Sequence, residues 1–153
     1  MISVINILSA LSDDKAFVLY NTIALGKGRD FDTLVKNMGI TPHQYYSRIL
    51  KITQAGLVKR ENSEYVTTAL GDIVYEAVSI IGKALNHFWV LKAIEAFKSS
   101  ASIESNESIS KLIDSLIDDP KIKKILNEPP ILSTIDDPKI KKILNEPPIL
   151  STS

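Results

Sequence analysis

Few residues of this 153-residue chain carry side chains suited to making or breaking bonds. Cysteine is absent, which excludes disulfides, thiolate zinc sites, iron–sulfur clusters and cysteine nucleophiles. His43 and His87 are the only histidines, too few for a histidine-based metal or catalytic centre. The sequence also has no glycine-rich phosphate loop and no G-x-S-x-G or H-E-x-x-H motif. We therefore predict that the protein is not an enzyme and uses no cofactor or metal.

Side chains that can hydrogen-bond to phosphates and base edges gather between residues 41 and 60. This window contains four cations, Arg48, Lys51, Lys59 and Arg60, and no acidic residue. The whole chain has 18 basic and 18 acidic residues, so its formal net charge is zero. Neutrality excludes a non-specific polycation but permits a focused basic surface.

A helix over residues 41–55 has two contrasting faces at about 100° per residue. Tyr45, Ile49 and Ile52 share one face, which we expect to enter the core. The opposite side, called the outer face, suits the major groove of DNA, which admits one helix. Its residues are Gln44, Ser47, Arg48, Lys51 and Ala55, with His43 beside them and Tyr46 on the flank. The alternative interpretation is a solvated basic surface or a protein-binding surface.

Three helices are predicted up to residue 55. The first covers residues 11–25, with Ser12 as its cap and an apolar face of Ala16, Leu19, Tyr20 and Ile23. The second covers residues 31–38, has Phe31, Leu34 and Val35 facing inward, and ends at Gly39. The third has Thr41 as its cap and Pro42 at its first position, and it ends at Gly56. The turn at Gly39 makes the last two a candidate helix–turn–helix.

Two β-prone runs follow and precede a long helix. Residues 57–60 and 64–68 read as strands joined by a turn at Glu61-Asn62-Ser63. Thr68 is the expected cap of a helix over residues 69–97, with Gly82 as the expected place for a kink.

The apolar stripe of this long helix is wider than a small domain can cover. We predict that it forms a homodimer interface through Ile73, Ala77, Ile81, Leu85, Phe88 and Trp89. In the alternative, the C-terminal helices fold back to cover it. His87, Phe88 and Trp89 either line an effector pocket or serve in packing.

The remaining residues read as a linker over 99–107 and a helical tail over 108–153. The tail helix is expected to begin near Ser108, with a stripe of Ile109, Leu112, Ile113, Leu116 and Ile117. Residues 117–134 recur letter for letter at 135–152, which we interpret as a tandem duplication rather than a solenoid. Each copy predicts a short helix, capped by Asp119 or Asp137, opened by a proline and ended by a Pro-Pro pair. A partner-docking helix and a loosely packed extension both remain open for this tail.

The string ITPHQYYSRILKITQAGLVKRENSEYVTTALGDIVYE resembles winged helix–turn–helix transcriptional regulators, most of all archaeal members related to the ArsR and MarR groups. The resemblance covers about residues 8–98. It implies a mainly α fold with a β-hairpin wing and a DNA-binding domain that is commonly dimeric. We place the DNA-binding domain at 1–68 and the dimerisation helix at 69–98, ahead of the helical tail. By position, the groove-facing residues would be Thr41, His43, Gln44, Ser47, Arg48 and Lys51, with Lys59, Arg60 and Asn62 in the 57–68 wing. Tyr46, on the flank of the same helix, is a further candidate for contact with the DNA backbone. The metal-sensing ligand pattern of ArsR proteins is missing from this sequence. Glu61 and Glu64 lie near the tip of the predicted wing, where their carboxylates would repel DNA phosphates.

These observations predict a cytoplasmic homodimer that binds double-stranded DNA to regulate transcription. The longest uncharged run of the most apolar region, Ala84 to Leu91, is far below the roughly 20 residues of a membrane span. We also read the N-terminus as part of the fold and not as a signal peptide. The alternative function is a winged-helix protein–protein interaction module or assembly subunit that does not bind DNA.

Overall fold

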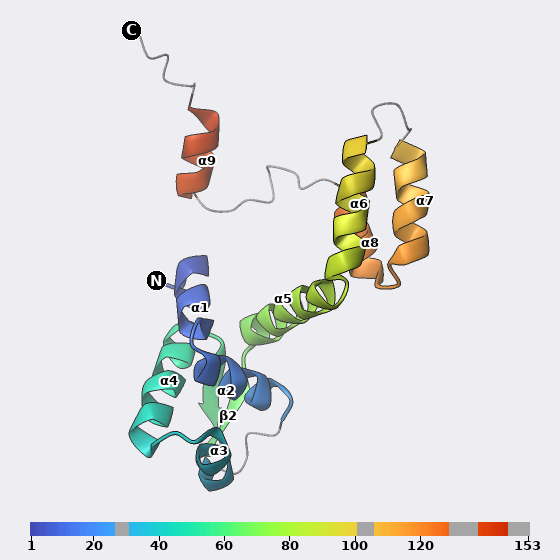
Figure 1. Ribbon diagram of the computed structural model, residues 1–153. Helices are drawn as coiled ribbons and strands as arrows, with labels where there is room; N and C mark the ends of the chain where they lie inside the picture. The colour runs from blue at the N-terminus through green and yellow to red at the C-terminus, as the bar shows by residue number, and fades with distance from the viewer. Residues whose placement is uncertain (27–30, 101–105, 129–137, 147–153) are drawn as a thin grey trace, which may run out of the picture. The chain divides into compact units, whose positions relative to one another are not determined.

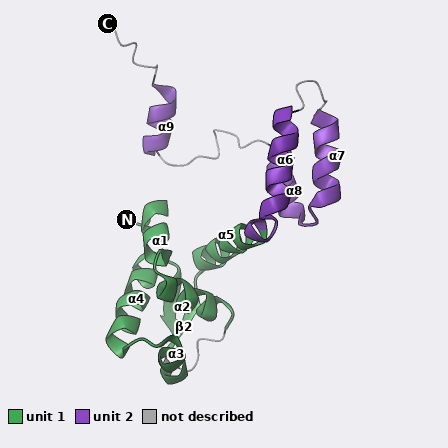
Figure 2. Ribbon diagram, viewed as in Figure 1, with its two compact units in different colours: residues 1–83 green, residues 84–153 purple. Residues whose placement is uncertain are grey.

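The computed structural model describes residues 1–26, 31–100, 106–128 and 138–146. Within them the chain forms nine helices and one two-stranded antiparallel sheet (Figure 1). The chain divides into two compact units, residues 1–83 and residues 84–153, which are coloured separately in Figure 2. The prediction of a mainly helical chain with one small hairpin is confirmed.

The N-terminal unit begins with α1 (Val4–Leu11) and α2 (Asp14–Ala24). Helix α1 was not predicted. Helix α2 corresponds to the helix predicted over 11–25, but it starts three residues later, and the predicted cap Ser12 is wrong. The carboxylate of Asp13 caps α2 by accepting a hydrogen bond from the Lys15 backbone N–H at 3.3 Å. The Ser12 hydroxyl instead donates to the Ser9 carbonyl at 2.8 Å, where α1 ends. A charged carboxylate also interacts favourably with the positive end of the α2 dipole.

Helices α3 (Phe31–Met38) and α4 (Pro42–Gln54) match the predicted second and third helices. Gly39 has a φ of +60°, a left-handed conformation that glycine adopts without steric cost and that ends α3. Leu34 and Val35 of α3 pack against the core, as predicted. The side chain of Phe31 lies outside the described residues.

A β-hairpin follows α4. Strand β1 (Val58–Glu61) pairs with β2 (Glu64–Thr67) so that Glu61 lies opposite Glu64. The turn is therefore two residues long, not the predicted three. Asn62 and Ser63 have φ values of +48° and +67°, the signs that a type I′ turn requires.

The start of α5 (Ala69–Asn86) is fixed against the hairpin. Thr68 is the predicted cap: its hydroxyl accepts from the Gly71 N–H at 2.9 Å and donates to the Gly56 carbonyl at 2.6 Å. A Cβ on Gly71 would lie 2.0 Å from the Leu57 carbonyl oxygen, so only glycine fits there. The Tyr20 hydroxyl donates to the Gly71 carbonyl, and burial raises the pKa of Tyr20 to about 12.

The core of this unit lies between α2, α4 and the hairpin. All four predicted inward residues of α2 and all three of α4 are buried. Its most deeply buried side chains are Leu19, Tyr20, Ile52, Leu57 and Val58.

The C-terminal unit contains α6 (Phe88–Ser100), α7 (Asn106–Leu116), α8 (Pro120–Asn127) and α9 (Pro138–Asn145). Helix α7 contacts both α6 and α8. Ile94, Ile113, Ile117 and Ile122 are buried here. Of the predicted stripe, Ile113 and Ile117 are buried, Ile109 and Leu112 are half-buried, and Leu116 is 40% exposed. Residues 101–105 of the predicted linker, both Pro-Pro pairs and the predicted cap Asp137 lie outside the described residues.

The predicted continuous helix over 69–97 is wrong. Helix α5 passes through Gly82 as an α-helix and ends at Asn86. The His87 N–H donates to the Ala84 carbonyl at 3.1 Å, and α6 begins at Phe88. No proline or glycine marks this break, so the sequence gives no local signal for it.

Candidate nucleic-acid interface

The outer face of α4 is set by the residues on its inner face. Tyr45, Ile49 and Ile52 are at most 3% exposed, which confirms the predicted helical phase. Burial raises the pKa of Tyr45 to about 12, as expected for a phenol held away from water. Because these three side chains face the core, the opposite side of α4 must face solvent.

Most of the predicted groove-facing side chains are exposed together on α4. They are His43, Gln44, Tyr46, Ser47 and Lys51. Arg48 is half-buried, and Ala55 is only 3% exposed, so the placement of Ala55 on the outer face is wrong. Helix α4 ends at Gln54, and Gly56, with a φ of +79°, turns the chain toward the buried Leu57.

The N-terminus of α4 is held by a reciprocal capping box. The Gln44 N–H donates to the Thr41 hydroxyl at 3.2 Å, and the Thr41 N–H donates to the Gln44 side-chain oxygen at 3.0 Å. Pro42 occupies the first helical position, where its missing N–H costs nothing. These residues keep the first turn of α4 ordered, and that turn presents His43 to solvent.

Arg48 occupies a different position from the rest of the outer face. It is half-buried, its Nε donates to the Asp13 carboxylate, and its Nη1 donates to the Gln44 carbonyl at 3.1 Å. The hydrogen bond from Arg48 lowers the pKa of Asp13 below its ordinary value of 3.8. Arg48 therefore joins α4 to the N-terminus of α2, a contact between residues 35 positions apart.

The hairpin supplies the remaining predicted contacts. Lys59, Arg60 and Asn62 are all exposed. The Lys59 ammonium lies 3.1 Å from the Glu61 carboxylate, an exposed pair with a small energetic effect. Lys51 and Arg60 form no ion pair with the residues that the structure describes. The effective positive charge of the 41–60 window is therefore carried mainly by these two residues.

A groove of about 230 Å³ lies beside Lys51, between α1 and α4. It is lined by Asn6, Ser9 and Ala10 of α1 and by Lys51, Gln54 and Ala55 of α4. Amide, hydroxyl and ammonium groups meet here, a combination that can hydrogen-bond to an anion. The sequence prediction missed this extension of the surface because it did not include α1.

Exposed apolar residues form a stripe along α5. Ile73, Ala77, Ile81 and Leu85 recur at every fourth position and share one side of the helix. Ile73, Ile81 and Leu85 are all exposed, at 67%, 60% and 67%. Val74 and Tyr75, on another side of α5, pack against the core.

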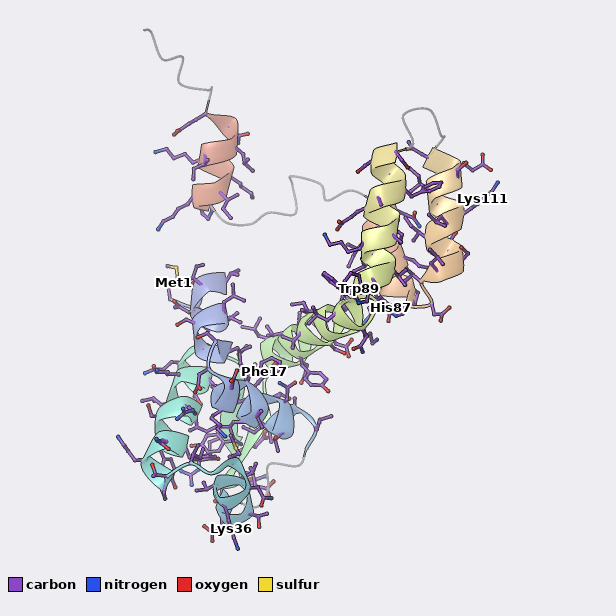
Figure 3. The ribbon with its side chains drawn as sticks, in the orientation of Figure 1. Met1, Phe17, Lys36, His87, Trp89 and Lys111 are labelled. Atoms are coloured by element: carbon purple, nitrogen blue, oxygen red, sulfur yellow. The ribbon has the colours of Figure 1, made fainter. Side chains whose placement is uncertain are left out.

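The two aromatic residues of the predicted stripe belong to the next helix. Phe88 and Trp89 begin α6, after the break at His87. Their rings pack edge to face, with the ring centroids 5.2 Å apart. Figure 3 labels Trp89 and His87 close to that break. Trp89 is 80% exposed.

Helix α1 carries another exposed apolar surface, which the sequence prediction missed. Val4, Ile5 and Leu8 are 65%, 68% and 60% exposed and recur at helical spacing. The other side of α1, through Ile7, Ala10 and Leu11, packs against the core. The sequence contains a signal for α1, because Ser3, a possible helix cap, precedes a run of apolar residues near the N-terminus.

Two kinds of site are absent from the described part of the chain. No three residues among its histidines, aspartates and glutamates are grouped so that they could hold a metal ion. None of its described helices is both long enough and apolar enough to cross a membrane.

Comparison of the chain with protein families, curated proteins and solved structures finds no match.

Proposed function

We propose that this protein is a DNA-binding transcriptional regulator of the winged helix–turn–helix kind, acting in the cytoplasm as a homodimer. In this proposal α3, the Gly39 turn and α4 are the helix–turn–helix, and the hairpin is the wing. The observation that carries it is the exposed polar outer face of α4, which follows that turn and is positioned by a buried inner face.

The proposed contacts divide by chemistry. His43, Gln44 and Ser47 would face base edges from the first half of α4, with Thr41 at its start. Lys51 and Arg60 would bind phosphates, while Tyr46, Lys59 and Asn62 lie on the flanks. Because Arg48 is held by Asp13, we assign it mainly to the orientation of α4.

The α5 stripe supports the dimer. Two copies of Ile73, Ala77, Ile81 and Leu85 facing each other would remove four exposed apolar positions per chain from water. A two-fold dimer would place two α4 helices in successive major grooves, about 34 Å apart, and would select a palindromic site.

Binding to duplex DNA tests the proposal. Selection from random duplexes with the full chain should recover palindromic sequences. Lys51→Ala should then weaken binding to the selected duplex by about tenfold. The matched control is Lys111→Ala, which removes the same charge from α7, where Lys111 pairs with Glu107 at 2.7 Å. Failure to enrich any duplex, or an equal loss in both variants, would contradict the proposal.

A second candidate function is a protein–protein interaction module without DNA binding. The ion pairs of Arg48 and Lys59 favour it, because they reduce the charge available to phosphates. The exposed apolar residues of α1 also suit a protein partner. This candidate predicts no enrichment in the selection, whatever the salt concentration.

A further inference from the structure

The repeat provides an internal comparison of one sequence in two environments. Helices α8 and α9 both read PKIKKILN and have the same length. Ile122 of α8 is 4% exposed, whereas its counterpart Ile140 of α9 is 45% exposed. Leu126 is half-buried, and its counterpart Leu144 is 54% exposed. Ile125 and Ile143 are exposed in both copies, at 59% and 70%.

This comparison identifies the docking side of the repeat helix. The residues that change, Ile122 and Leu126 in the first copy, lie four positions apart on one side. The residue that does not change, Ile125, lies on another side. The first copy docks through Ile122 and Leu126, and α9 carries the same side at Ile140 and Leu144.

The surface that receives α8 belongs to α7 and the turn after it. Helices α7 and α8 contact each other, and Ile113 and Ile117 have no exposed surface. The Lys123 ammonium donates to the Asp114 carbonyl at 3.0 Å, near the C-terminus of α7, where a cation is favourable. Each of these features of α8 has an identical counterpart in α9.

We propose that α8 and α9 are interchangeable occupants of this α7 surface within one chain. The major state has α8 docked, and a minor state has α9 docked in its place. This inference goes beyond the proposed function and does not depend on DNA binding.

Loop length decides which copy prevails. Two residues, 118 and 119, separate Ile117 from α8, whereas the twenty residues 118–137 separate it from α9. A tenfold longer loop is less favourable by about 30-fold, since the closure entropy grows as three halves of the logarithm of length. With identical contacts, α9 should therefore occupy the surface in about 3% of molecules, a typical minor-state population.

The rate of amide hydrogen exchange in α7, residues 106–116, measured in the full chain, tests whether α9 can replace α8. Ile140→Asp should leave exchange of α7 within twofold of the parent, because α8 still docks. Ile122→Asp should speed it by about 30-fold and no more, because α9 takes over. The double variant should exchange at least tenfold faster than Ile122→Asp, because a carboxylate cannot be buried in either copy.

Ile125→Asp is the matched control, since it puts the same charge on an exposed position of α8. It should change the exchange of α7 by less than threefold. If the amides of α7 exchange as fast in Ile122→Asp as in the double variant, the proposal is overturned. It is also overturned if the amides of α7 exchange slowly in the double variant. A rescue by α9 that disappears on dilution would also overturn it, because docking within one chain is independent of concentration.

Discussion

Gly71→Ala is expected to destabilise the N-terminal unit because of one close approach. A Cβ at this position would lie 2.0 Å from the Leu57 carbonyl oxygen and 3.0 Å from its carbon. Both are backbone atoms next to β1, so no flexible side chain can move aside. The start of α5 and the 57–58 segment would have to separate by about 1 Å.

The size of the effect follows from two opposing contributions. Overpacking against backbone costs about 3 kcal/mol, the upper end of its usual range. Replacing glycine by alanine within a helix returns about 1 kcal/mol. The expected net loss for Gly71→Ala is therefore about 2 kcal/mol in the free energy of unfolding. Gly82→Ala is the matched control, because nothing lies within 4 Å of its Cβ position and it should gain about 1 kcal/mol.

Urea unfolding of both variants, followed by circular dichroism, measures the free energy of unfolding, which should fall in Gly71→Ala and rise in Gly82→Ala. The two variants should differ by about 3 kcal/mol, with the parent between them. If Gly71→Ala is as stable as the parent, the close packing of α5 against Leu57 is wrong. A parallel loss in both variants would mean that the loss arises from α5 itself.

Three further predictions concern the dimer, an ion pair and the hairpin. Ile81→Asp should weaken dimerisation by about 30-fold in sedimentation experiments without loss of helix, and an unchanged association would reject the α5 interface. Asp13→Asn keeps a capping side chain but removes the charge that pairs with Arg48. Because folding lowers the pKa of Asp13, the parent should be more stable than this variant by at most about 1 kcal/mol near neutral pH. This advantage should vanish as the pH falls through the lowered pKa, and a gap in urea midpoints that persists in acid would contradict it. Ser63→Gly should stabilise the hairpin unit by about 0.5–1 kcal/mol in urea, because glycine adopts a φ of +67° without strain; a loss would contradict the turn geometry.

Local sequence signals predicted the parts of the fold that local chemistry determines. Thr41, Pro42 and Gly56 mark both ends of α4, and its apolar spacing fixes which side is buried. The strands were predictable from the change of periodicity after Gly56. These signals lie within a few residues of the structure that they specify.

Competition between neighbouring signals explains one failure. Ser12 and Asp13 are both good capping residues, so the sequence alone does not choose between them. The Ser12 hydroxyl is used by the carbonyl of Ser9, which leaves Asp13 to begin α2. The predicted helix over 11–25 therefore began too early, and α1 was absent from the prediction, together with the groove beside Lys51.

The remaining differences from the prediction have no local signal in the sequence. The pairing of Arg48 with Asp13 spans 35 residues and has no local signal, yet it changes the charge that the outer face presents. The break at His87 likewise follows from no helix-breaking residue. The exposure of Ile140 in α9 could not be predicted either, because α9 has the same sequence as α8, in which the equivalent Ile122 is buried.

The salt dependence of duplex binding tests the central claim most directly. The parent and the Lys51→Ala/Arg60→Ala variant should be titrated with the same selected duplex across a series of salt concentrations. Each phosphate contact adds about 0.9 to the slope of log affinity against log salt, so the variant should lose about 2 per subunit. A parent that binds no duplex at low salt, or a variant whose slope equals that of the parent, would contradict DNA binding through α4 and the hairpin.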